Sequence, residues 1–266
     1  MFRLHSLNVL IAGKGELIPL IRSSKLLNNL YVTSEEDVEG AESIRFNTFK
    51  ELAIKCKSLQ IDIVIVENEM WILQGIADVL RKNFVNCIAP VSRWAEITIS
   101  NKQAKELLDK YNVANPSVLS FPNCFPVNLR ADKICMTANS MKELIKFRQE
   151  LNTYPDEIIK TAFLEECIEG MKVSLTSLFD GRNLISFPVQ DLTDTQQLKL
   201  DEYSRKLEYM FNSEKAEFIG FISSELIWSG NEWYNQGFGL KFPKPDIDIL
   251  YILVSAIYQK LNEIKI

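Results

Sequence analysis

Residues 61–67, with the sequence IDIVIVE, constrain the fold of this chain more than any other stretch. Four consecutive β-branched residues within it are typical of a strand that is buried on both faces of a parallel sheet. Strand-like runs at 7–12, 30–34 and 85–90 are separated by stretches of helical period. This alternation predicts a doubly wound parallel α/β sheet up to about residue 95.

The pattern changes after the proline-punctuated stretch NVANPSVLSFPNCFP at 112–126, which predicts a domain junction. Beyond it, Asp180-Gly181 joins two alternating apolar runs, and Ser229-Gly230-Asn231 joins two more. Both are hairpin signals. The second half is therefore expected to be an α+β unit. Capping boxes predict three helix starts, at Thr48, Ser100 and Ser140.

Composition excludes several classes of function. The net charge is −5 and the basic residues are scattered, which argues against a nucleic-acid partner. The apolar stretch from Ile249 to Tyr258 is too short to span a bilayer, and no export signal is visible. We therefore expect a cytoplasmic protein without a membrane partner.

Residue counts limit the available chemistry further. His5 is the only histidine, which removes Ser-His-Asp triads, Cys-His dyads and histidine-based metal sites. Five cysteines without a CxxC pair predict neither a disulfide framework nor a zinc site. Any chemistry has to use carboxylates, lysines, arginines or backbone groups.

Two stretches can be interpreted either as purely structural or as part of a functional site. Gly13-Lys14-Gly15 follows the first strand and is either a tight turn or the start of a phosphate-binding turn, with Ile18 where a third glycine would stand. Glu165 and Glu166 lie at the end of a strand-like run before Gly170. They are either a solvated strand end or part of a site.

Five stretches, in chain order, are similar to motifs of one enzyme family: IDIVIVENEMWILQGIADVLRKN, SNKQAKELLDKYNV, FPVNLRADK, LEECIEGMKVSLTSLFDGRNLISFPVQD and EFIGFISSELIWSGNEWYNQGFG. The family is phosphoribosylamine–glycine ligase, the glycinamide ribonucleotide synthetase of purine biosynthesis, within the ATP-grasp superfamily. The resemblance covers most of the chain. It implies a Rossmann-like pre-ATP-grasp domain at 1–115, a reduced ATP-grasp domain at 116–266, and no family C-terminal domain.

The resemblance also implies cofactors and site residues. ATP and magnesium would be the cofactors. The hinge that meets the adenine would be Glu165, Glu166, Cys167 and Ile168. Arg130 would lie over the phosphates, and Gly13 and Gly15 would form a phosphate turn. Asn235 and Glu232 would remain from the metal site.

Departures from the family pattern are as informative as the match. Asn101 stands at the first lysine position, Met171 and Lys172 replace acids, and Trp233 replaces the metal-binding glutamate. The glycine-rich flap after RADK is missing. A hydrogen bond to a charged group is worth roughly 1.5–3 kcal/mol, so three lost contacts remove about 5–9 kcal/mol. A micromolar affinity amounts to about −8 kcal/mol.

We therefore expect ATP and magnesium to bind weakly or not at all, and catalysis to be lost. A binding or regulatory role would remain, with a protein partner, a homodimer or a small-molecule ligand in the remnant cleft all open. One alternative is an active minimal ATP-dependent carboxylate–amine ligase, with Arg130 over the phosphates and Asn235 with Glu225 or Glu232 on the metal. Another is a structural module whose cleft is collapsed by Trp233.

Trp233 separates these interpretations. Residues two apart on a strand share a face, so Trp233 and Asn235 should lie opposite Tyr234. The motif places Trp233 in the cleft with Arg130. In the alternative, Glu232 takes the position of the acid and Trp233 packs under the sheet.

Overall fold

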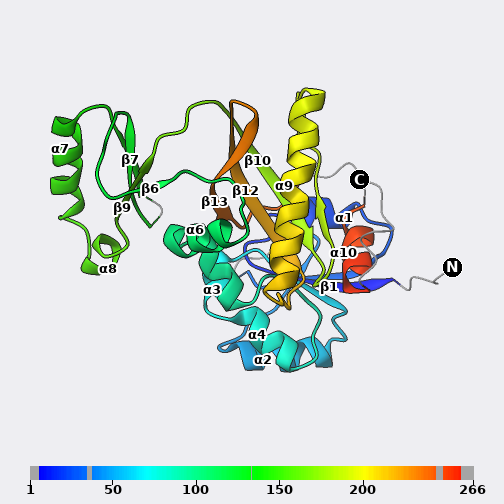
Figure 1. Ribbon diagram of the computed structural model, residues 1–266. Coiled ribbons are helices and arrows are strands. Elements are labelled where there is room, and N and C mark those ends of the chain that lie inside the picture. Colours follow the sequence, from blue (N-terminus) through cyan, green and yellow to red (C-terminus); the bar gives the residue numbers. More distant parts are fainter. Residues whose placement is uncertain (1–5, 35–37, 133, 244–247, 259–266) are drawn as a thin grey trace.

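The computed structural model describes residues 6–34, 38–132, 134–243 and 248–258, which form three sheets with flanking helices (Figure 1). The N-terminal sheet has the strand order β3-β2-β1-β4-β5. All of its strands are parallel, which confirms the predicted α/β sheet. Its strands are β1 (Leu7–Ala12), β2 (Leu27–Val32), β3 (Glu42–Ser43), β4 (Ile63–Val66) and β5 (Cys87–Ile88).

Both faces of this sheet are covered, as the run of β-branched residues predicts. Leu10 and Val64 point to one face, where α2 (Phe49–Ser58) and α4 (Ile76–Lys82) pack. Val9 and Ile65 point to the other face, which meets α1 (Ile18–Arg22) and α10 (Ile249–Ile257). The helix α10 comes from the far end of the described chain, so the core of the first sheet is completed by a distant segment.

The structure corrects two predicted helices. A single helix over 71–82 is wrong, because α3 (Glu69–Leu73) and α4 are separate helices. Gly75 lies between them in the left-handed conformation, with φ of 84°, and this breaks the helical hydrogen-bond series. A helix over 16–27 is also wrong, because α1 ends at Arg22 and the chain must turn before β2 begins at Leu27. The helix predicted at 246–264 lies partly outside the described residues.

The second half contains an antiparallel sheet with the order β11-β10-β12-β13. Its strands are β10 (Met171–Phe179), β11 (Leu184–Ser186), β12 (Gly220–Ser229) and β13 (Glu232–Gly239). Both predicted hairpins are present. The first is fixed by Asp180, whose Oδ1 accepts the backbone N–H groups of Arg182 and Asn183 at 2.9 and 2.6 Å. The long helix α9 (Asp194–Ser213) covers one face of the sheet.

A small third sheet stands apart from the other two, at the left of Figure 1. It has the order β6-β9-β7-β8 and its own buried core against α7 (Met141–Leu151) and α8 (Asp156–Ile159). We call residues 116–166 the small lobe. Its strands are β6 (Val118–Leu119), β7 (Val127–Ala131), β8 (Ile134–Ala138) and β9 (Phe163–Glu166).

The segment before the small lobe joins the N-terminal sheet to α9. It consists of α5 (Ser92–Ala95), a 3-10 turn (Glu96–Thr98) and α6 (Asn101–Lys110). Trp94 packs edge-on against Phe211 of α9, with ring centroids 5.3 Å apart. The predicted boundary at 115 stays a prediction. None of the described helices is long and apolar enough to cross a membrane.

Candidate functional site

Three charged side chains meet where the small lobe joins the rest of the molecule. Glu165 at the end of β9 is fully buried. Its Oε2 lies 2.8 Å from Lys105 Nζ of α6, and its Oε1 accepts the Nε–H of Arg130 on β7. We call Lys105, Arg130 and Glu165 the hinge cluster. Because β7 and β9 are adjacent antiparallel strands, the sequence-predicted Arg130 and Glu165 are neighbours.

The two cations of the hinge cluster donate further hydrogen bonds within the protein. Arg130 also donates Nη2–H to Gln236 Oε1 of β13 at 3.1 Å. Lys105 donates to the carbonyl oxygen of Pro116 at 2.6 Å and to Asn115 Oδ1 at 3.2 Å. Burial lowers the pKa of Lys105, and the Glu165 carboxylate partly offsets this effect. The cluster therefore joins α6, the small lobe and β13 through polar contacts.

The remaining hinge residues lie outside the buried cluster. Glu166 is exposed, and its backbone N–H donates to the carbonyl oxygen of Ser117 at 2.9 Å. Cys167 and Ile168 follow the last paired residue of β9 and precede β10, and both are half-buried. Burial raises the pKa of the Cys167 thiol, and Cys135 on β8 shows the same effect. Raised pKa values leave both thiols protonated at neutral pH, so neither is an activated nucleophile.

The connection from β7 to β8 is short. Ala131 pairs with Ile134, which leaves only residues 132 and 133 between the two strands. Asp132 adopts a left-handed conformation with φ of 51°, and its carbonyl oxygen accepts the side-chain N–H of Asn101, 2.6 Å away. A two-residue turn is too short to fold over a triphosphate. Asn101, at the expected lysine position, serves as a contact between α6 and this turn.

The glycine turn between β1 and α1 is occupied by a side chain of the protein itself. The Glu67 carboxylate accepts the backbone N–H groups of Gly15, Glu16 and Leu17, at 2.8, 3.1 and 2.5 Å. Gly13 is needed for this approach, because a Cβ atom there would lie 2.7 Å from Glu67 Cβ. Converging N–H groups at a helix start are suited to an anion. Here the anion is internal.

A pocket of about 780 Å³ lies beside this turn. Its walls include Glu16, Leu17 and Glu67 from the turn, together with Lys241 and Phe242 from the segment after β13. The Lys241 Nζ forms an ion pair with Glu225 Oε1 of β12 at 2.5 Å, and Ser174 donates to the same oxygen at 3.0 Å. Glu225 is therefore occupied by a lysine and a hydroxyl group.

The residues expected at the metal site do not converge. Asn235 is buried and donates Nδ2–H to Tyr203 OH of α9 at 2.6 Å. Glu232 lies three residues earlier on β13, on the opposite face, near the β12–β13 turn. Within the described residues, no group of three or more His, Cys, Asp or Glu side chains could hold a metal ion. The side chains present do not fit a magnesium ion at this position.

Trp233 packs under the sheet and does not enter the cleft. It is fully buried, lies 5.1 Å from Trp228 between ring centroids, and donates Nε1–H to the carbonyl oxygen of Gln196 at 2.9 Å. Gln196 belongs to α9. Trp233 and Asn235 do share a face, as strand periodicity predicts, but this face meets α9. The expectation that Trp233 lies in the cleft with Arg130 is wrong. The face of β13 that carries Trp233 packs against α9, and the indole is buried there.

Sequence reasoning missed two of the most informative residues. Lys105 lies in the SNKQAKELLDK stretch, and only its position on the inner face of α6 distinguishes it from exposed lysines. Glu67 ends the β-branched run, directly where parallel strands present their carboxyl ends. That position was a usable signal, since polar groups there often face a ligand or a neighbouring turn.

Comparisons with known sequences identify relatives over nearly the whole chain. The chain is 21% identical over 327 residues to phosphoribosylamine–glycine ligase of Fusobacterium nucleatum, covering 98% of this chain and 75% of that enzyme. It is 28% identical over 156 residues to the human trifunctional purine biosynthetic protein adenosine-3, covering 52% of this chain and 15% of that protein. No protein-family model matches the chain.

Solved structures show the same fold. Phosphoribosylamine–glycine ligase of Thermotoga maritima has a TM-score of 0.72 at 16% identity, over 97% of this chain and 76% of that one. D-alanine–D-alanine ligase of Bacillus anthracis complexed with ATP has a TM-score of 0.60 at 12% identity, over 97% and 95%. The chain is therefore a homologue of phosphoribosylamine–glycine ligase at low sequence identity, with the ATP-grasp fold.

Proposed function

We propose that this protein is a non-catalytic homologue of phosphoribosylamine–glycine ligase that keeps a binding role. The turn between β7 and β8 is the observation on which the proposal rests. In the ligase pattern a glycine-rich flap leaves the strand at this point and closes over the γ-phosphate. Here two residues join paired strands. Without a flap, water is not excluded and the transferring phosphoryl group has fewer donors.

The occupied polar groups support the same proposal. Arg130 uses Nε and Nη2 within the protein, so a phosphate would have to compete with Glu165 and Gln236. Asn235 bonds to Tyr203 on the helix side of the sheet. A phosphate at the glycine turn would have to displace the Glu67 carboxylate from three N–H groups. Each displacement costs a hydrogen bond to a charged group, roughly 1.5–3 kcal/mol.

Calorimetric titration with Mg-ATP tests the proposal, together with an assay of ADP release in the presence of phosphoribosylamine and glycine. The Thermotoga maritima enzyme is the positive control. We expect no ADP release above background and a Kd for Mg-ATP weaker than about 10 μM, roughly −7 kcal/mol. Substrate-dependent ADP release with tighter binding would instead establish the active minimal ligase.

The cysteines are consistent with the compartment that we propose, the cytoplasm. Cys56 and Cys87 are buried and free, and Cys124 is free and exposed. Exposed free thiols persist in a reducing environment.

A further inference from the structure

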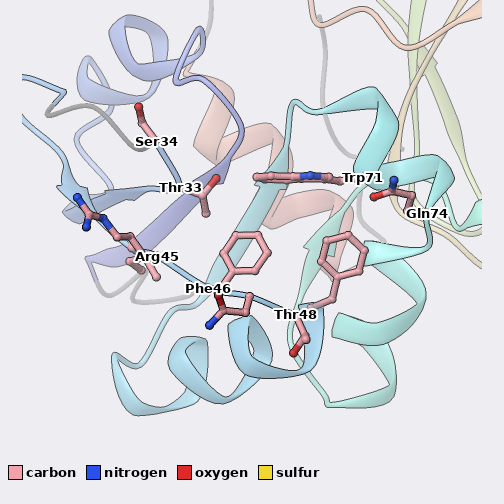
Figure 2. A pocket seen from close by; sticks show the side chains of 10 residues that line it. Thr33, Ser34, Arg45, Phe46, Thr48, Trp71 and Gln74 are labelled. Carbon is pink, nitrogen blue, oxygen red and sulfur yellow. The ribbon is translucent and has the colours of Figure 1, made fainter.

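A cavity at the edge of the N-terminal sheet is not explained by the ligase comparison. It has a volume of about 840 Å³, within the range of small-molecule sites. Thr33 and Ser34 follow β2, Arg45 and Phe46 follow β3, and Trp71 comes from α3 after β4 (Figure 2). The cavity therefore lies outside the carboxyl ends of parallel strands, where open α/β sheets bind ligands.

Three aromatic rings form one wall of this cavity, which we call the aromatic pocket. Phe46 and Trp71 meet edge-on, with ring centroids 5.3 Å apart, and Phe49 lies 6.4 Å from Trp71. All three are only half-buried. Figure 2 shows Phe46 and Trp71 together on one side of the pocket and the Arg45 guanidinium at the other end. An open aromatic wall of this kind is suited to a planar ring.

The other end of the pocket is suited to an anion. Arg45 is exposed, and its guanidinium forms no ion pair with any residue in the described ranges. The helix α2 begins beside it, capped by Thr48, whose side chain accepts the Glu51 N–H at 3.2 Å. The first N–H groups of a helix have no partner within the helix and favour negative charge. The Glu51 carboxylate is already bound to Lys55 and to the Asn47 N–H, each at 2.9 Å.

We propose that the aromatic pocket binds a planar-ring compound with an anionic group, of the chemical class of nucleoside monophosphates. The ring packs against Trp71 and Phe46. The phosphate binds Arg45, which offers two parallel N–H donors, and the start of α2. This site is separate from the hinge cluster and needs no magnesium. It does not depend on whether ligase activity is retained.

Titration of the full chain with 5′-AMP in the presence of EDTA tests the site. Binding is measured by calorimetry and by tryptophan fluorescence. We expect one saturable site below about 1 mM, with adenosine weaker and inorganic phosphate weakest. Arg45→Ala should weaken AMP binding about 10-fold and leave adenosine binding unchanged. Arg148→Ala is the matched control, since Arg148 is an exposed arginine on α7 in the small lobe.

Trp71→Phe keeps an aromatic ring and should weaken AMP and adenosine by the same factor, because it changes only the stacking surface. Circular dichroism confirms that each variant is folded. Equal AMP affinity in the wild type and Arg45→Ala overturns the proposal, and so does the absence of saturable binding.

Discussion

At the hinge, the buried Glu165 carboxylate pairs with buried Lys105 and half-buried Arg130, whereas in the aromatic pocket Arg45 stands exposed beside three half-buried rings. Both regions are places where an α/β protein of this kind could bind a nucleotide. The difference lies in what the charged groups already contact. At the hinge they connect the small lobe to α6 and β13, whereas the Arg45 guanidinium at the aromatic pocket has no ion-pair partner among the described residues.

The same contrast appears within the N-terminal sheet. At the β1–α1 turn three N–H groups are satisfied by Glu67, while the aromatic pocket, a few residues beyond the neighbouring strands, stays open. A filled anion site contributes to folding, because its donors exchange water for a protein acceptor. An open site contributes to binding. Resemblance to a family identifies which residues stand at the site positions. Only the contacts of those residues show whether a site is filled by the protein itself or open to a ligand.

The largest effect should follow from breaking the hinge cluster. Glu165→Gln leaves buried Lys105 and half-buried Arg130 without their anion, and an uncompensated buried charge typically costs about 3–5 kcal/mol. The free energy of unfolding, measured by urea denaturation, should fall by this amount. Glu166→Gln alters the exposed neighbour and should change little. If Glu165→Gln lowers the free energy of unfolding no more than Glu166→Gln does, the hinge cluster does not stabilise the contact between the small lobe and the rest of the molecule.

Opening the glycine turn should have a smaller effect and a diagnostic consequence. Glu67→Ala removes the acceptor of three N–H groups and should cost about 1–3 kcal/mol. Inorganic phosphate should then raise the melting temperature of Glu67→Ala more than that of the wild type, since the emptied turn is a phosphate site that the wild type lacks. Glu16→Ala, an exposed neighbour, serves as the control. Equal stabilisation of all three proteins would refute the idea of an internally filled turn.

Trp233→Phe tests whether this residue belongs to the core or to the cleft. The change removes the bond from Nε1 to Gln196 and some buried volume, so we expect a loss of about 1–2 kcal/mol. Mg-ATP affinity should be unchanged, because the indole faces α9. Trp228→Phe, at a half-buried position on β12, should cost less. A higher Mg-ATP affinity in Trp233→Phe would indicate that Trp233 lies in the cleft.

Alkaline pH should weaken the core beneath the aromatic pocket. Burial raises the pKa of Cys56, on α2, from 9.0 to about 11, and that of Cys87 to about 12. Below pH 9 both thiols are protonated in the folded and unfolded states. Above it the unfolded chain loses protons first, so the free energy of unfolding falls as pH rises toward 11.

Cys56→Ala should flatten this decline by on the order of 1 kcal/mol per pH unit. Urea unfolding at pH 8, 9 and 10 measures the slope of the free energy of unfolding against pH, to which each thiol contributes about one proton. Cys124→Ala, at an exposed position, is the control. Parallel pH profiles for the two variants would exclude Cys56 as the source.

Local rules predicted much of the fold. The predicted helix starts at Thr48, Ser100 and Ser140 are all present, because a side chain that accepts an N–H three residues ahead acts within one turn. The parallel sheet followed from β-branched runs, and the hairpin at Asp180-Gly181 from turn chemistry. Gly75 also had a local signal, and the helix break there could have been predicted.

Tertiary structure decided the contacts that bear on function. The pairing of Glu165 with Lys105 joins residues 60 positions apart, and Glu67 reaches a turn about 50 positions earlier, so neither contact leaves a local pattern. For Trp233 the sequence determined which residues share its face, since strand periodicity is local, but not which layer that face meets. That choice depends on where α9 packs. The sequence thus determined the strands, the capped helix starts and the family resemblance, and packing determined which charged groups contact one another.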